Sequence, residues 1–120
     1  MNWEGFVKTE RLEIQSKYES EIRFGPAYFK LKSIPEIKLL EFDIYGDWFY
    51  RHKSFLFLQQ WNSTKTPNTN LICINLNSFE YKIVLDRIQS VFWLMEFKNE
   101  KLYFIDDYNK KKYLIDLSKL

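Results

Sequence analysis

Short segments in which apolar residues alternate with polar ones recur along this chain, separated by Asn, Ser, Lys or Gly. This alternation is typical of β-strands, because successive side chains of a strand point to opposite faces of its sheet. The segments are also rich in Ile, Phe, Tyr and Leu, as strands are. The pattern predicts strands within residues 11–15, 27–33, 54–61, 70–77, 81–86, 90–97, 101–107 and 112–117. The predicted fold class is therefore all-β, built from antiparallel sheet.

The parity of the apolar positions predicts which strands are covered on one face and which on both. Ile72, Ile74 and Leu76 point one way, while Cys73 and Asn75 point the other, which predicts a half-buried strand. Cys73 is read as a small buried hydrophobic residue. Residues 54–61 and 90–97 are apolar in both parities, which predicts central strands covered on both faces.

Three stretches depart from simple alternation. The apolar phase changes between Leu39 and Leu40, which predicts a bulge or a bend. Residues 83–95 have some apolar positions at helical spacing, but their β-branched and aromatic content favours paired strands. Residues 6–22 are compatible with a strand or with a short N-terminal helix, and the strand is favoured.

A weak internal repeat suggests how the strands are arranged. Residues 54–61 and 90–97 are similar in character, and their spacing is close to the ~40 residues of a β-propeller blade. So few units cannot close a ring, and an ordinary meander of short strands produces similar repetition. We predict one β domain over residues 1–120, folded as a single, strongly twisted antiparallel meander that resembles a partial β-propeller or a half-barrel.

Residues that commonly carry chemistry are scarce in this chain. It has 11 Phe, 8 Tyr and 4 Trp, but one His, one Cys and three Gly. No glycine-rich nucleotide-binding motif, nucleophile motif or Cys/His pair at metal-ligand spacing is found in the sequence. His52, with Tyr50, Arg51 and Lys53 beside it, is the one candidate general base, and an ordinary surface or core histidine is the favoured interpretation. We predict a protein without enzymatic activity, cofactor or metal.

The distribution of charge and hydrophobicity bears on location and partners. Residues 1–14 lack the basic and apolar regions of a signal peptide, and no stretch approaches the ~20 apolar residues of a membrane helix. These features predict a cytoplasmic protein that does not bind membranes. The run Lys110, Lys111 and Lys112 follows two acidic residues and reads as a hairpin tip rather than a phosphate-binding site. Nucleic acid is therefore not the expected partner.

The aromatic residues divide into two groups. One group falls within apolar strands and is expected to fill the core, namely Phe55, Phe57, Phe92, Trp93, Phe97 and Phe104. A second group, Trp48, Tyr50 and Trp61, lies near turn-forming residues and supplies the candidates for partner contacts, because Trp and Tyr bring large contact area at low entropic cost. For Trp48 and Trp61, burial in the core is the favoured alternative.

A small, aromatic-rich β chain with strands such as SFLFLQQW and SVFWLMEF, joined by lysine and asparagine turns, resembles the small immunity proteins of bacterial polymorphic toxin systems, including contact-dependent growth inhibition. The resemblance implies a non-enzymatic inhibitor that binds a cognate toxin domain, often a nuclease. Many such inhibitors are acidic, whereas this chain has a pI near 8.6, so the resemblance implies either a local acidic patch or a mostly aromatic interface. The candidate partner-binding residues are Trp48, Tyr50, His52, Trp61, Glu96, Glu100, Asp106 and Asp107.

Two other functions remain open from the sequence. About ten short strands could close into an up-and-down barrel around a small apolar ligand. Alternatively, stacked aromatic rings and lysines could bind single-stranded nucleic acid.

Overall fold

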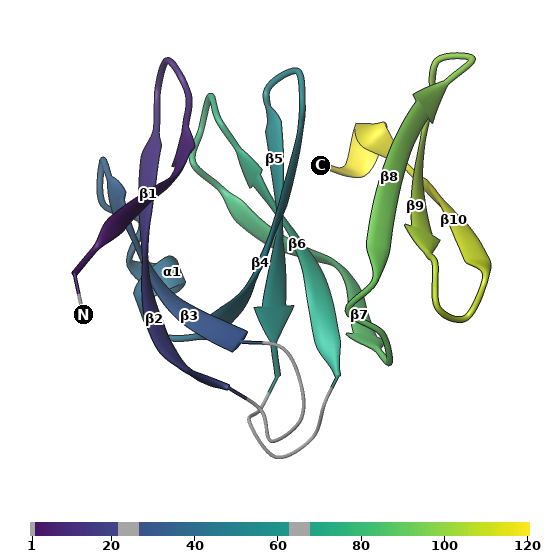
Figure 1. The fold of residues 1–120 in the computed structure, drawn as a ribbon. Helices are drawn as coiled ribbons and strands as arrows, with labels where there is room; N and C mark the ends of the chain where they lie inside the picture. Colours follow the sequence, from purple (N-terminus) through teal and green to yellow (C-terminus); the bar gives the residue numbers. More distant parts are fainter. Residues whose placement is uncertain (1, 22–26, 63–67) are drawn as a thin grey trace.

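The computed structural model describes residues 2–21, 27–62 and 68–120, and within them the fold is all-β (Figure 1). A seven-stranded sheet, called the large sheet, contains β1 (Glu4–Lys8), β2 (Glu13–Glu21), β3 (Ala27–Ile34), β4 (Ile44–His52), β5 (Phe55–Trp61), β6 (Thr69–Asn75) and β7 (Tyr81–Ile88). A three-stranded sheet, called the small sheet, contains β8 (Trp93–Lys98), β9 (Lys101–Asp106) and β10 (Lys111–Ile115). Two short helices complete the described structure, α1 (Lys38–Glu41) and the 3-10 helix η1 (Leu117–Lys119).

The topology is an antiparallel meander that is divided once. Strands β1 to β7 pair in sequence order, and so do β8, β9 and β10. Among the described residues, no strand ladder joins the large sheet to the small one, and neither sheet closes into a barrel. The prediction of an all-β antiparallel fold is confirmed, but the strands form two sheets rather than one.

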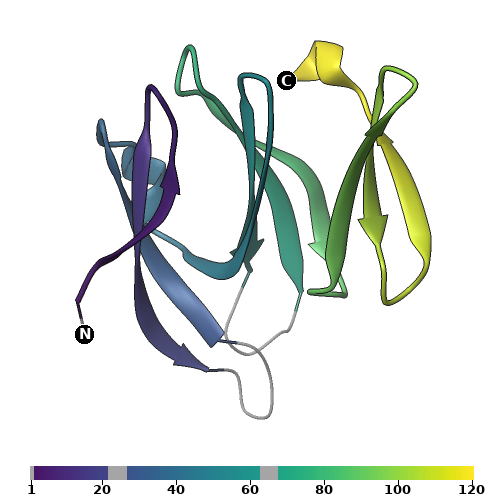
Figure 2. The ribbon, with the colours of Figure 1, turned by 45° about the horizontal axis from the view of Figure 1, so that its top comes forward.

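The large sheet curls, and one hydrophobic cluster fills its concave side (Figures 1 and 2). Strands β1 to β6 all contribute, which requires the two ends of the sheet to approach the same core. The helix α1 adds Leu40, and Ile37 just before it is buried in the same cluster. The buried members are Val7, Leu12, Ile14, Leu31, Ile37, Leu40, Tyr45, Leu56, Leu58, Ile72, Ile74 and Leu76.

A second hydrophobic cluster lies between the two sheets. Phe57, Leu71 and Cys73 come from the large sheet, and they pack with residues that the small sheet contributes. Those residues are Trp93, Leu102, Phe104 and Ile115. Side chains of β5 and β6 therefore enter both clusters, and these two strands are buried on both faces.

Burial confirms one prediction about covered strands and corrects two. Residues 54–61 supply β5, which is covered on both faces as predicted. Residues 70–77 supply β6, which is not half-buried, because the small sheet covers Leu71 and Cys73. Residues 90–97 supply β8, which is an edge strand with Leu94 exposed, and not a central strand. The large sheet covers only one face of the small sheet, so the β8 side chains that point to the other face lie in solvent.

The three ambiguous stretches are also resolved. The phase change at Leu39 and Leu40 is one helical turn, α1, which turns Leu40 into the core and leaves Leu39 exposed. Residues 6–21 contribute to β1 and β2, so the alternative of an N-terminal helix is wrong, and residue 22 lies outside the described residues. Residues 83–95 contribute to β7 and β8, which are strands as predicted but belong to different sheets.

Replacing Leu56 by Ala tests the doubly covered centre of the large sheet. Leu56 is fully buried in the concave cluster, so Leu56→Ala is expected to lower the free energy of unfolding by about 2–5 kcal/mol through lost burial and a cavity. Urea unfolding followed by tryptophan fluorescence measures this change. The control is Leu39→Ala on the exposed face of α1, which should change stability by less than about 0.5 kcal/mol. Equal losses in the two variants would contradict the assigned core.

Candidate functional site

Strand β4 contains a β-bulge opposite β5, and a surface cleft lies beside it. Tyr45 lies opposite Gln60 and Phe49 lies opposite Leu58, so β4 advances by four residues where β5 advances by two. Such a bulge bends a strand and redirects its side chains. Within the described residues β3 and β4 have a single register pair, Phe29 with Tyr45. Beyond that pair β4 is free to turn its side chains away from β3.

Gly46 permits the close packing inside this bulge. A Cβ atom at Gly46 would overlap the side-chain carboxamide of Gln59 on the neighbouring strand. The absence of a side chain lets this carboxamide lie against the backbone of β4, and its Nε2 donates a hydrogen bond to the Val91 carbonyl over 3.2 Å. The bulge is thereby tied to residues 89–92, which connect the two sheets.

The bulge opens a cleft of about 330 Å³, which we call the Trp48 cleft. Its walls come from β3, β4, β5 and the connection between β7 and β8. It is lined by Ala27, Phe29, Asp47, Trp48, Gln59, Val91 and Phe92. The lining is aromatic and apolar, with an amide and one carboxylate.

The floor of the Trp48 cleft is held in place by several contacts. The Trp48 ring packs edge-on against Trp93, with 5.1 Å between centroids and planes 78° apart. Trp93 in turn donates its indole N–H to the Ser90 carbonyl over 2.8 Å and packs on Phe104. A ring held in this way loses little further freedom when a partner binds it.

Two exposed aromatic rings form the rim of the cleft. Phe92 is 62% exposed and Tyr108 is 70% exposed, and their ring centroids are 6.3 Å apart. The backbone N–H of Asp107 donates to the Phe92 carbonyl over 2.8 Å, which fixes the β9–β10 turn beside this rim. Two acidic residues lie near Phe92, Asp47 in the cleft wall and Asp107 in the turn. The Asp107 carboxylate also contacts the Lys110 ammonium at 3.1 Å.

The structure brings together some of the predicted partner-binding residues and separates others. Trp48 lines the cleft and Asp107 borders its rim. Tyr50 is half-buried against the cluster between the sheets. Trp61 is 2% exposed and belongs to the interior, so its prediction as a surface contact is wrong. Its indole N–H has no hydrogen-bond partner among the described residues.

The other predicted acidic residues do not form one patch. Glu96 contacts Lys112 at 4.0 Å on the outer side of the small sheet, and Glu100 is exposed in the β8–β9 turn. Asp106 is buried and accepts hydrogen bonds from the backbone and side chain of Asn109. Burial raises the pKa of Asp106, but hydrogen bonds from Asn109 and Ser90 outweigh burial, so the pKa lies below its ordinary value. Asp106 thus stabilises a turn.

His52 lies under the small sheet instead of on the surface. Its ring packs on Phe97 with 4.3 Å between centroids, and its buried Nε2 has no hydrogen-bond partner within the described ranges. Burial, and secondly the charge of Lys53, lowers the pKa of His52. This enclosed ring packs in the interior, but its unpartnered Nε2 differs from the surface or satisfied core histidine that the sequence favoured.

Sequence reasoning missed Phe92 and Tyr108. Phe92 and Phe97 were both expected in the core, yet they are 62% and 40% exposed, whereas Trp93, Phe57 and Phe104 are buried as expected. Phe92 precedes β8, and its apolar context resembles that of a strand interior. Tyr108 lies within a polar turn, and this placement was the one available sign of an exposed ring.

Several other polar side chains are hydrogen-bonded to one another inside the fold. Gln60 donates to Asp43 and to the Tyr81 hydroxyl, and Asn70 donates to Gln60. The hydroxyls of Tyr45 and Tyr81 lie 3.4 Å apart. Burial raises the pKa of both tyrosines, that of Tyr81 to about 12, so both remain protonated near neutral pH.

Burial also raises the pKa of the thiol of Cys73, the single cysteine of the chain. The Cys73 side chain lies between the two sheets, and burial raises its pKa to about 12. The thiol therefore stays protonated at neutral pH and behaves as a small apolar group, as the sequence predicts.

Comparison with known proteins gives no relative for this arrangement. No family model, no curated protein and no solved structure matches the chain. A search of the described residues finds no group of three or more His, Cys, Asp or Glu side chains placed to hold a metal ion. The helices in the described part of the chain are too short to cross a membrane.

Replacing Gly46 by Ala tests how the Trp48 cleft is built. The added methyl group should displace the Gln59 carboxamide and break its hydrogen bond to Val91, at a cost of about 1–3 kcal/mol in the free energy of unfolding. Urea unfolding measures the loss. In a Gln59→Ala background the obstructing group is absent, so the same Gly46→Ala change should cost less than about 0.5 kcal/mol. Equal costs in both backgrounds would contradict this account.

The lowered pKa of His52 predicts a pH dependence of stability. In the unfolded chain His52 binds a proton with the ordinary histidine pKa of 6.5, whereas the folded protein resists protonation. The free energy of unfolding should therefore be constant above pH 6.5 and fall as the pH drops below it. His52 is the only histidine, so His52→Phe should flatten the decrease between about pH 7.5 and 5.5 in urea unfolding. An unchanged slope in the variant would show that another group is responsible.

Proposed function

We propose that this chain is a cytoplasmic, non-enzymatic protein-binding module, and specifically an immunity protein that neutralises a cognate bacterial toxin domain. The resemblance of the chain to small immunity proteins suggests the class of partner. The Trp48 cleft with its rim of Phe92 and Tyr108 is the surface we assign to the partner.

The exposed aromatic rim carries this proposal. Phe92 and Tyr108 present two large rings to water beside a cleft whose tryptophan is held in position. Exposed apolar surface of this kind often marks an interaction site. Tryptophan and tyrosine are enriched among the residues that supply most binding energy, especially where a pocket receives a side chain of the partner.

The charges around the cleft favour a basic partner. Asp47 lies in the cleft wall, so a cationic side chain placed against the Trp48 or Phe92 ring can pair with its carboxylate, whereas Asp107 at the rim is already paired with Lys110. An arginine from the partner fits both contacts. This local arrangement would allow a chain with a pI near 8.6 to bind a basic toxin domain, such as a nuclease.

The same features argue against the two other functions considered from the sequence. The described strands form two open sheets, so they do not enclose the barrel cavity expected of a carrier for a small apolar ligand. The Asp47 carboxylate in the cleft wall would repel the phosphates of a single-stranded nucleic acid. A protein partner is therefore the better match.

The direct test uses the product of the open reading frame adjacent to this gene. We expect a stoichiometric complex in isothermal titration calorimetry, and relief of growth arrest when the two proteins are co-expressed. Phe92→Lys should weaken the complex at least about tenfold, because it removes the exposed ring and adds a charge that repels a basic partner.

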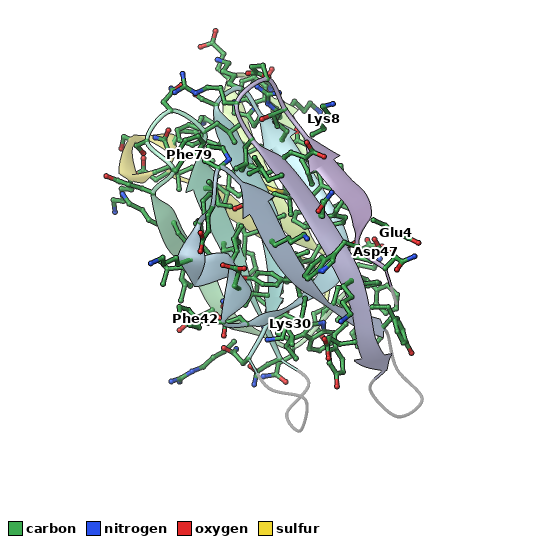
Figure 3. The ribbon with its side chains drawn as sticks, turned by 90° about the vertical axis from the view of Figure 1, so that its left-hand side faces the viewer. Glu4, Lys8, Lys30, Phe42, Asp47 and Phe79 are labelled. Atoms are coloured by element: carbon green, nitrogen blue, oxygen red, sulfur yellow. The ribbon has the colours of Figure 1, made fainter. Side chains whose placement is uncertain are left out.

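Phe42→Lys is the matched control for this variant. Phe42 is 73% exposed and follows α1, which lies on the side of the large sheet away from the small sheet (Figures 1 and 3). This variant should bind as the unmodified protein does. Failure of the adjacent gene product to bind would count against the immunity assignment, and equal effects of the two substitutions would count against the Trp48 cleft as the interface.

A further inference from the structure

Four strands in the described part of the chain have one unpaired edge, namely β1, β7, β8 and β10. An unpaired edge presents backbone N–H and C=O groups that can pair with another strand. Irregularities make some edges poor templates, and register shifts interrupt both β1 and β7. The ladder between β9 and β10 has no such shift, so β10 offers a regular edge of five residues, or about 17 Å.

A groove runs along this edge, between β10 and β7. One hollow of about 310 Å³ is lined by residues 82–85 of β7 and by Leu114, Ile115 and Asp116, with Lys119 and Leu120 at its end. A second hollow of about 120 Å³ is lined by residues 85–89, Lys111 and Tyr113. The two hollows share Leu85, so they adjoin. The start of β7 faces the end of β10, which shows that the two strands run antiparallel across the groove.

Apolar side chains stand on both walls of the first hollow of this groove. Ile83 of β7 is 56% exposed and Leu114 of β10 is 59% exposed, while Leu85 and Ile115 lie deeper. Natural sheets commonly protect open edges with charged residues or irregular backbone. Lys111 and Lys112 charge the first half of β10, whereas the apolar walls beside its second half suit the alternating side chains of an added strand.

The charges at the groove favour an acidic occupant. Lys82 and Lys119 lie at one end, and Arg87 and Lys111 lie at the other. The Lys82 ammonium donates a hydrogen bond to the Lys119 carbonyl. Because this acceptor is neutral, Lys82 keeps its positive charge.

Two of the nearby acidic groups are already engaged. Asp116 pairs with the Lys119 ammonium at 4.0 Å and accepts hydrogen bonds from the backbone and hydroxyl of Ser118, and the buried Asp106 accepts from Asn109. Asp86 remains as an acidic group of the groove with no ion pair or hydrogen bond in the described structure. With Lys119 paired to Asp116, the groove keeps three basic side chains, Lys82, Arg87 and Lys111, against the carboxylates of Asp86 and the buried Asp106.

The geometry points to a second binding site, distinct from the Trp48 cleft. An extended acidic peptide segment of a partner protein adds as a strand to the open edge of β10 and rests its apolar side chains against β7. The cleft adjoins β8 through Trp93, whereas this groove follows β10, so the two sites lie at opposite edges of the small sheet. Binding here does not depend on the toxin partner proposed above.

Synthetic peptides and ¹⁵N- and methyl-labelled protein test this site by NMR. The probe is a blocked eight-residue peptide in which valine alternates with glutamate. We expect shifts and slower hydrogen exchange for amides of Lys111–Ile115, and shifts for the methyl groups of Ile83 and Leu85. A peptide of the same sequence with N-methylated backbone amides should not bind, because it cannot form the ladder. A valine and lysine peptide should bind about tenfold more weakly.

Charge reversal on the protein gives an independent readout. Lys82→Glu combined with Lys111→Glu should weaken binding of the glutamate peptide about tenfold. The matched control is Lys98→Glu with Lys101→Glu, at the exposed β8–β9 turn, which should leave binding unchanged. Absence of shifts at millimolar peptide, equal binding of the N-methylated peptide, or equal effects of the two double variants would each overturn the assignment.

Discussion

The burial of β5 and β6 on both faces is the constraint on which the rest of the structure depends. Leu56 and Leu58 enter the concave cluster of the large sheet, while Phe57, between them, enters the cluster under the small sheet. Burying a side chain of this size contributes about 1.5–3 kcal/mol, so leaving either face in water would forfeit several such contributions. The chain meets this demand by curling the large sheet around one face and folding the small sheet over the other.

The division into two sheets also creates the surfaces that are available for binding. The connection between β7 and β8 is held by the Trp93 indole on Ser90 and by the Gln59 amide on Val91. Because the meander is broken there, the small sheet keeps two unpaired edges. One lies near the Trp48 cleft, which the preceding connection helps to line, and the other lies beside β7 and borders the groove. Both surfaces are products of how the sheets are joined, and neither is visible in any single strand.

Much of the local structure could be predicted from the sequence because alternation reports directly on the two faces of a strand. It located β2, β3 and β5 to β10, and it placed Trp93 and Cys73 inside, but it did not mark β4, the strand that carries Trp48. It did not predict that β8 is an edge strand, because its residues are apolar in both parities whether or not a second layer covers them. Phe92 and Phe97 were misassigned for that reason, and Trp61 was misassigned because a nearby turn does not prevent burial. Of the candidate site, sequence reasoning anticipated Trp48 and Asp107 but not Phe92 or Tyr108.

The sequence by itself determined that this protein is an antiparallel β structure with a core rich in aromatic residues, since side-chain parity and β propensity are local properties of the chain. The tertiary structure alone decided where the meander breaks, which strands become edges and which aromatic rings remain in water. These outcomes depend on contacts between residues far apart in the chain, such as Trp48 with Trp93 and Phe92 with Tyr108. A pattern of neighbouring residues states which face a side chain takes, but not what covers that face.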